Sequence, residues 1–250
     1  TVSFSWLIMS LIGALPLYIS KDIPIYSDAL FEIISGFTTT GSSILTDVEV
    51  LSHCNLFWRS FSHWLGGMGV LVFILAILPM AGGSTMNLMK AESPGPSVGK
   101  LVPKIQQTAF LLYAIYFSMT IVEFILLLFG KMPVFDAICL SFGTAGTGGF
   151  GIKNDSIASY STYLQIVITI FMFLFGVNFT FYYYLLLRKA KEAFHIEEVR
   201  WYFYFYISAV ALITFSLVRR GDNFLESLQQ VAFQVASIMT TTGYATCDFD

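Results

Sequence analysis

The sequence predicts an all-α integral membrane protein built from a repeated unit: a spanning helix, a short re-entrant helix, a loop and a second spanning helix. Composition is the first reason: of the 250 residues, 56% are hydrophobic and 12% are charged, and the mean hydropathy is +0.73. Soluble domains average about 25% charged residues, and a soluble fold could not bury so much apolar surface. The second reason is a Thr/Gly-rich run that occurs three times at a spacing of roughly 100 residues.

Charge and cysteine content exclude other classes. The 13 basic and 16 acidic residues give a net charge of −3, so no basic face for nucleic acid is expected. Cys54, Cys139 and Cys247 are an odd number without metal-like spacing, which predicts neither a disulfide framework nor a zinc site. No Lys or Arg precedes Lys21. The first apolar run therefore lacks the basic start of a signal peptide and is predicted to span the membrane.

Apolar stretches of two lengths alternate along the chain, and a spanning helix needs about 20 mostly apolar residues. The predicted spans are Phe4–Ser20, Leu56–Met80, Ile105–Phe129, Tyr160–Leu187 and Trp201–Val218. Shorter segments, predicted to be re-entrant helices, are Ser27–Phe37, Pro133–Phe142 and Phe224–Met239.

A Thr/Gly-rich loop follows each re-entrant segment: the first loop at 38–41, the second within 144–150 and the third at 240–243. Ser35, Ser141 and Ser237 stand three residues before the first threonine of each loop. Aligned on these serines, the glycine follows after six, seven and six residues. This alignment predicts an internal repeat whose second loop carries one extra residue.

The repeat predicts how the chain is organised. The expected segments are a first pore repeat at 1–80, a cytoplasmic connector at 81–103, a second repeat at 104–187, a second connector at 188–200 and the first half of a third repeat at 201–250. The chain is thus expected to be partial, with two and a half repeats. Eleven of the sixteen acidic residues lie on the loop side, and the connectors are net positive. We therefore expect the loops outside.

The loops have the chemistry of a cation pathway. Non-helical backbone at membrane depth is tolerated only where it is buried in protein or lines a water-filled cavity. Backbone carbonyls can replace the water shell of a cation, glycine accepts the required backbone angles, and threonine adds a hydroxyl. The C-terminal end of a re-entrant helix, with about −0.5 charge, favours a cation. The candidate cation-binding residues are Thr38, Thr39, Thr40, Gly41, Ala145, Gly146, Thr147, Gly148, Thr240, Thr241, Thr242 and Gly243.

Other positions leave alternatives open. In the second loop either Gly146 or Gly148 is expected to match Gly41, and Gly148 is favoured because Gly149-Phe150 follows it. Three polar residues are candidates near the outer mouth or behind the loops: Glu123, Arg59 and Asn178. Glu123 is the one ionisable residue deep in a predicted span, where such residues are functional candidates. Arg59 either pairs with an acidic residue such as Glu32 or tunes the local field, and Asn178 either supports packing or lines the pore.

Several motifs resemble those of the Trk/Ktr/HKT superfamily of potassium transporters, most closely its Trk branch. The motifs are Ser-Gly-Phe-Thr-Thr-Thr-Gly at 35–41, Phe-Trp-Arg at 57–59, Trp-Leu-Gly-Gly-Met-Gly at 64–69, Ala-Glu-Ser-Pro-Gly-Pro at 91–96, Asn-Phe-Thr at 178–180 and Thr-Thr-Thr-Gly-Tyr-Ala-Thr at 240–246. The resemblance implies four such repeats in a K⁺-channel-like pseudo-four-fold arrangement around one pore that transports K⁺. It also implies a multi-pass protein of the plasma or inner membrane, a homodimer and a cytoplasmic nucleotide-binding regulatory subunit. Glycine at Gly41 implies preference for K⁺ over Na⁺.

Two alternative functions fit the sequence less well. An intramembrane serine protease would use Ser42 or Ser43 with His63, but the chain has no Gly-x-Ser-x-Gly motif and this reading leaves the second and third loops without a role. Another kind of polytopic pore, such as an aquaporin-like fold, uses half-helices that enter from opposite faces, whereas the repeat here places every loop on one face. The sequence therefore predicts a transport protein without catalytic residues or a catalytic cofactor.

Overall fold

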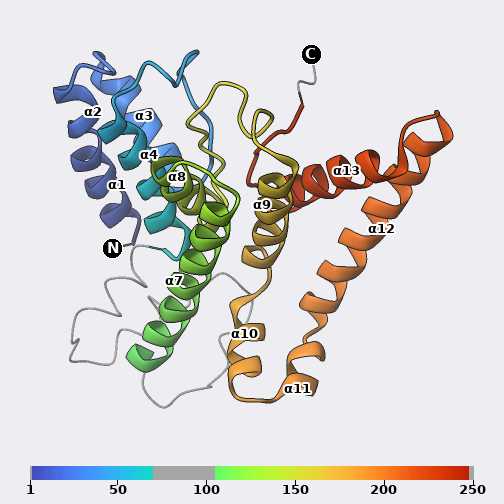
Figure 1. The fold of residues 1–250 in the computed structure, drawn as a ribbon. Helices are drawn as coiled ribbons and strands as arrows, with labels where there is room; N and C mark the ends of the chain where they lie inside the picture. The colour runs from blue at the N-terminus through green and yellow to red at the C-terminus, as the bar shows by residue number, and fades with distance from the viewer. Residues whose placement is uncertain (1, 70–104, 248–250) are drawn as a thin grey trace.

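The computed structural model describes residues 2–69 and 105–247, and every regular element within these ranges is a helix. Figure 1 shows their arrangement. The helices are α1 (Val2–Gly13), α2 (Leu15–Ile19), α3 (Tyr26–Phe37), α4 (His53–Gly67), α7 (Ile105–Phe129), α8 (Val134–Ala145), α9 (Thr162–Phe175), α10 (Phe179–Leu186), α11 (Ala190–Phe194), α12 (Glu197–Arg219) and α13 (Phe224–Met239).

The predicted spans and re-entrant segments correspond to helices. α7 coincides with the span predicted at Ile105–Phe129, and α13 coincides with the re-entrant segment predicted at Phe224–Met239. Among the described residues, Ala109–Phe129 and Glu197–Arg219 are each long and apolar enough to cross a membrane. The second predicted span begins as α4, and its remainder beyond Gly69, with the connector predicted at 81–103, lies outside the described residues.

Two predicted spans are interrupted. The first consists of α1 and α2, which are separated at Ala14, with Pro16 in the first turn of α2. The span predicted at 160–187 consists of α9 and α10, which meet at 88°, so this segment is not one continuous helix. Gly176 ends α9, and a Cβ at this position would collide with the side chains of Thr240 and Tyr202. The break therefore comes from close packing against the third loop and α12.

The three short helices α3, α8 and α13 begin in a similar way. Each has one acidic residue in its first turn, Asp28, Asp136 and Glu226 respectively, where a carboxylate stabilises the free amides of a helix N-terminus. The side chain of Asn223 also caps α13 by accepting a hydrogen bond from the Leu225 amide at 3.1 Å. These local signals favour the observed starts of the short helices. Each helix ends where its Thr/Gly loop begins.

Packing between the repeats brings the short helices together. α8 contacts α4 from the first predicted repeat as well as α7 and α9 from its own, and α13 contacts both α9 and α12. Figure 1 shows α13 lying across the upper end of α12 and pointing toward α9. The shared hydrophobic core reaches from Trp64 on α4 through Tyr116 on α7 to Phe233 on α13. The loops at the ends of α3, α8 and α13 therefore lie near one another.

Candidate functional site

The three loops share one backbone conformation. In each, the first residue after the short helix is right-handed, the second is a left-handed threonine and the fourth is a left-handed glycine. The threonines are Thr39, Thr147 and Thr241, with φ of 54°, 50° and 58°. The glycines are Gly41, Gly149 and Gly243, with φ of 74°, 78° and 84°. Left-handed backbone is rare for residues with a side chain, so its recurrence at matched positions identifies a repeated structure.

A hydrogen bond of the same kind closes each loop onto its helix. The amides of Thr40, Gly148 and Thr242 donate to the carbonyls of Ser35, Gly143 and Ser237 at 2.9, 3.0 and 2.9 Å. Gly143, rather than Ser141, is therefore the counterpart of Ser35 and Ser237. With this register the left-handed glycine follows after six residues in every repeat, and the second loop has no extra residue.

The corrected register changes the second loop. Ala145 is the last residue of α8, as Phe37 and Met239 are the last residues of α3 and α13. The equivalent of 38–41 is therefore 146–149, and the backbone counterpart of Gly41 is Gly149 rather than Gly146 or the favoured Gly148. The sequence held one signal for this register, because an aromatic residue directly follows both Gly149 and Gly243.

The glycines bring the loops into contact in a regular order. A Cβ on Gly41 would collide with the Gly148 carbonyl, and a Cβ on Gly149 would collide with the Thr242 carbonyl. In both contacts the glycine of one loop meets the residue just before the glycine of the next loop. A Cβ on Gly243 would meet no described atom within 4 Å. The three loops thus follow one another in the same rotational sense, and the described residues leave the side of Gly243 open.

Threonine hydroxyls hold the first and third loops to their helices. The Thr38 hydroxyl donates to the Ile34 carbonyl at 2.7 Å and lies 2.8 Å from the Thr40 hydroxyl. In the third loop Thr240 makes the same pair of contacts, with the Ala236 carbonyl at 2.8 Å and the Thr242 hydroxyl at 2.7 Å. Because these hydroxyls bond within the loop, they stiffen it, and the main-chain carbonyls remain as the candidate ligands.

The second loop is supported differently, by His63 of α4. Its glycines Gly146 and Gly148 replace the two threonines, and a Cβ at either position would collide with His63. His63 is fully buried and stacks on Phe150 with ring centroids 4.0 Å apart. The amide of Phe150 lies 3.5 Å from His63 Nδ1, and Arg59 Cζ lies 4.2 Å from the centre of the Phe150 ring. The His63 ring therefore fills the space that a threonine side chain takes at the position of Gly148, and the main-chain carbonyl of His63 fills the space at Gly146.

Arg59 and Glu32 form a buried ion pair between α4 and α3. Arg59 donates from Nε and Nη2 to Glu32 Oε1 at 2.8 and 2.6 Å, and the side chains are 2% and 0% exposed. The predicted pairing with Glu32 is thus confirmed. Glu32 also accepts from the Ser43 hydroxyl at 2.8 Å and from the Ile44 amide at 3.2 Å. The pair therefore fixes the segment that follows the first loop.

Glycines near the end of α4 let this helix pass between the first and second loops. A Cβ on Gly66 would collide with the Phe37 carbonyl, and a Cβ on Gly67 would lie 2.6 Å from the Gly146 Cα and 2.7 Å from the Tyr116 hydroxyl. The small residues that the sequence places here thus allow helix and loop backbones to touch, as small residues do in membrane helix packing.

The chain that carries these loops is similar to known proteins. The model of the TrkH family, described as a cation transport protein, matches residues 1–250. The chain belongs to the TrkH family. The Trk system potassium uptake protein TrkH of Salmonella typhimurium is 37% identical over 247 residues, which cover 96% of this chain and 51% of that protein. The Escherichia coli protein TrkG of the same system is 33% identical, over 98% of this chain and 51% of that protein.

A solved structure agrees with this assignment. The crystal structure of the potassium transporter TrkH from Vibrio parahaemolyticus matches with a TM-score of 0.82 at 28% identity, over 98% of this chain and 51% of that chain. The expected resemblance and fold class are confirmed, and this member of the TrkH family is a membrane protein. The chain spans about half the length of the relatives that it matches. The domain boundaries and the roles of the site residues stay predictions.

Two predicted site residues of this TrkH family member, Glu123 and Asn178, are not among the nearest neighbours of Gly41 or Gly149. Glu123 is fully buried on α7, and neither carboxyl oxygen has a hydrogen-bond partner among the described residues. Asn178 was expected in the middle of a span. It caps the N-terminus of α10 instead, where its side chain accepts a hydrogen bond from the Thr180 amide at 2.9 Å. The Ser43 hydroxyl bonds to Glu32 and not to His63, which does not favour the protease alternative.

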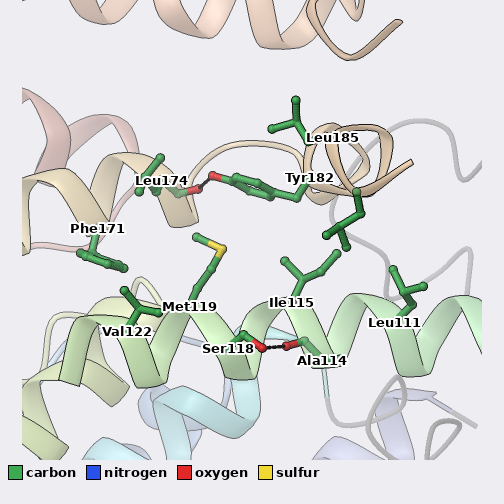
Figure 2. A pocket seen from close by; sticks show the side chains of 11 residues that line it. Leu111, Ala114, Ile115, Ser118, Met119, Val122, Phe171, Leu174, Tyr182 and Leu185 are labelled. Atoms are coloured by element: carbon green, nitrogen blue, oxygen red, sulfur yellow. Dashed lines mark hydrogen bonds between the residues drawn. The ribbon is translucent and has the colours of Figure 1, made fainter. Parts of the chain in front are cut away.

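A large cavity of about 600 Å³ lies elsewhere, between α7, α9 and α10. Figure 2 shows Ile115, Met119 and Val122 of α7 facing Phe171 and Leu174 of α9. Its two hydroxyl groups are already bonded to the main chain, Tyr182 to Leu174 O at 2.6 Å and Ser118 to Ala114 O at 2.7 Å. The remaining lining of the cavity is apolar. The cavity is therefore unsuited to a dehydrated cation.

We expect the substitution Glu32→Gln to lower the free energy of unfolding by about 3–5 kcal/mol, because it leaves the Arg59 charge buried without a counter-charge. The matched control is Glu192→Gln, which breaks the exposed ion pair with Lys189 (Nζ–Oε1 3.1 Å). Exposed pairs contribute about 0–1 kcal/mol. Denaturation in detergent measures both variants. Equal losses of stability would contradict a structural role for the buried pair.

Because the His63 ring occupies the space beside Gly148, we expect the effects of substitutions at these two positions to depend on each other. Gly148→Thr introduces the residue found at Thr40 and Thr242, but the His63 ring occupies its space, so we expect a loss of about 1–3 kcal/mol from overpacking. Combining it with His63→Ala is expected to recover part of this loss, with a coupling of about 0.5–3 kcal/mol in a double-mutant cycle. Strictly additive effects on thermal stability would show that the two positions do not compete for space.

Proposed function

We propose that this chain forms part of the membrane pore of a potassium uptake system. K⁺ is the transported ion, and main-chain carbonyls of the three loops bind it while it is dehydrated. The names of the relatives support potassium as the ion, since they are Trk system potassium uptake proteins. The way in which the loops contact one another supports the proposed binding site. The glycine of one loop meets a carbonyl of the next loop, and both contacts run in one rotational sense.

The proposed selectivity filter consists of residues 38–41, 146–149 and 240–243. Each set follows the C-terminal end of a short helix, where about −0.5 charge is directed at the loop. None of these loop residues is basic. A carbonyl cage of this kind stabilises a cation that has lost its water shell, and the bonded threonine hydroxyls keep the carbonyls in place.

The full pore needs more than these residues supply. The open side of Gly243 leaves room for another loop, and the relatives are about twice as long as this chain. We therefore place a fourth loop, from outside residues 1–250, in that position. The family resemblance supports a homodimer, a cytoplasmic nucleotide-binding regulatory subunit and a multi-pass location in the plasma or inner membrane. The protein is proposed to act as a transporter and not as an enzyme.

Substitution of two glycines tests the filter. Gly41→Ser and Gly149→Ser in the full-length protein are each expected to lower the K⁺/Na⁺ permeability ratio about tenfold, a difference of about 1.4 kcal/mol, because a side chain at positive φ displaces the carbonyls. Rubidium and sodium uptake into proteoliposomes measures the ratio.

The matched control is Gly221→Ser. Gly221 also has positive φ, at 108°, but no atom of the described residues lies within 4 Å of its Cβ position, and it belongs to the turn between α12 and α13. It is expected to keep the selectivity of the unmodified protein. If selectivity is unchanged in both filter variants, the proposed filter is wrong. If only Gly41→Ser changes it, the second-loop register is not relevant to binding.

A further inference from the structure

A second, smaller cavity lies directly beside the second and third loops. It measures about 300 Å³, and its walls include Thr147 and Thr240 from the loops and Gly176 from the break between α9 and α10. Asn178 and Glu198 complete the wall away from the loops. This cavity differs from the apolar one in Figure 2, because polar atoms make up the larger part of its lining surface.

The electrostatic character of this cavity is negative. Its lining includes Ala145 and Met239, the last residues of α8 and α13, and each helix end contributes about −0.5 charge. Glu198 is the one charged side chain among the described residues that line it. The lining also includes Gly67 and Phe175, the last residues of α4 and α9, and the first turns of α10 and α12, whose N-terminal ends contribute charge of the opposite sign. The C-terminal ends together with the Glu198 carboxylate outweigh these N-terminal ends, so the cavity attracts a cation.

Asn178 holds the Glu198 carboxylate at the wall of the cavity. Its Oδ1 accepts from the Thr180 amide at 2.9 Å, which turns its Nδ2 toward Glu198 Oε2, also at 2.9 Å. Glu198 forms no ion pair with the described residues, and Oε1 accepts no hydrogen bond from them. The charge is therefore positioned but not neutralised. The break between α9 and α10 creates this arrangement, because it frees Asn178 from the middle of a helix.

We propose that Glu198 is a conduction-determining residue: positioned by Asn178, its carboxylate concentrates K⁺ in the cavity beside the second and third loops. The inference rests on the proposed function and adds to it a site that raises local K⁺ concentration without discriminating between K⁺ and Na⁺. Focusing of this kind raises the rate of cation entry by about 10-fold or more at low ionic strength. It fades when salt shortens the Debye length from about 30 Å at 0.01 M to about 3 Å at 1 M.

The test uses Glu198→Gln in the full-length protein, because glutamine keeps the size of the side chain and an acceptor for Asn178 but removes the charge. K⁺ flux into or out of proteoliposomes is measured with K⁺ supplied on the side opposite the loops. We expect about a tenfold loss of flux at 0.01 M K⁺ and convergence with the unmodified protein near 1 M. The K⁺/Na⁺ ratio stays unchanged.

Two controls separate charge from structure. Glu197→Gln removes the same charge from the same first turn of α12, but Glu197 does not line the cavity, so it should lower the flux at low K⁺ by less than Glu198→Gln does. Glu198→Asp keeps the charge and should keep most of the flux at low K⁺. Equal losses for Glu197→Gln and Glu198→Gln, or a loss that persists at 1 M K⁺, would overturn the proposal.

The outcomes for the filter and for Glu198 are independent. A change in selectivity in Gly41→Ser together with unchanged low-salt flux in Glu198→Gln would support the filter and overturn the role of Glu198. Unchanged selectivity in the glycine variants together with a salt-dependent loss in Glu198→Gln would do the reverse.

Discussion

The close approach of glycine Cα atoms to carbonyl groups of the next loop sets how the three loops, and the helices before them, pack together. Gly41 against Gly148 and Gly149 against Thr242 leave no room for a Cβ, so the loops can pack as neighbours only where glycine occupies these positions. The left-handed backbone at the same residues turns the chain sharply at the contact. Glycine meets both demands, because it has no Cβ and accepts positive φ. The three loops can pack as neighbours because both demands are met at the same residues.

Different side chains produce the same loop conformation in different repeats. In the first and third loops, paired threonine hydroxyls tie the turn to the helix before it. In the second loop His63 takes that space, with its main-chain carbonyl at Gly146 and its ring at Gly148, and the ring stacks on Phe150. The backbone is the conserved feature of the three turns in this chain, and the side chains that support it are interchangeable within the limits of packing volume. This is consistent with carbonyls, and not hydroxyls, as the proposed ligands.

The carboxylates of Glu32 and Glu198 differ in the groups that they bond. The Arg59–Glu32 pair is buried and fully hydrogen-bonded at the carboxylate, so its charges are committed to holding α3, α4 and the segment after the first loop. The Glu198 carboxylate is bonded to a neutral amide, so its negative charge still acts on its surroundings. A paired charge stabilises structure, whereas an unpaired charge beside a polar cavity provides an electrostatic field.

The membrane-embedded helical class, the positions of the short helices and the existence of three loops could be predicted from the sequence, because apolar length and Thr/Gly composition are local properties. The sequence also indicated the partner of Arg59. The folded chain was needed to establish that Gly149 is the counterpart of Gly41, that α9 and α10 are separate helices and that His63 supports the second loop. The register of Gly149 rests on backbone angles and on the hydrogen bond from the Gly148 amide to the Gly143 carbonyl, which residue types alone do not reveal. The break and the role of His63 depend on contacts between residues far apart in the chain, Gly176 with Thr240 and Gly148 with His63, and periodicity along one segment carries no information about such neighbours.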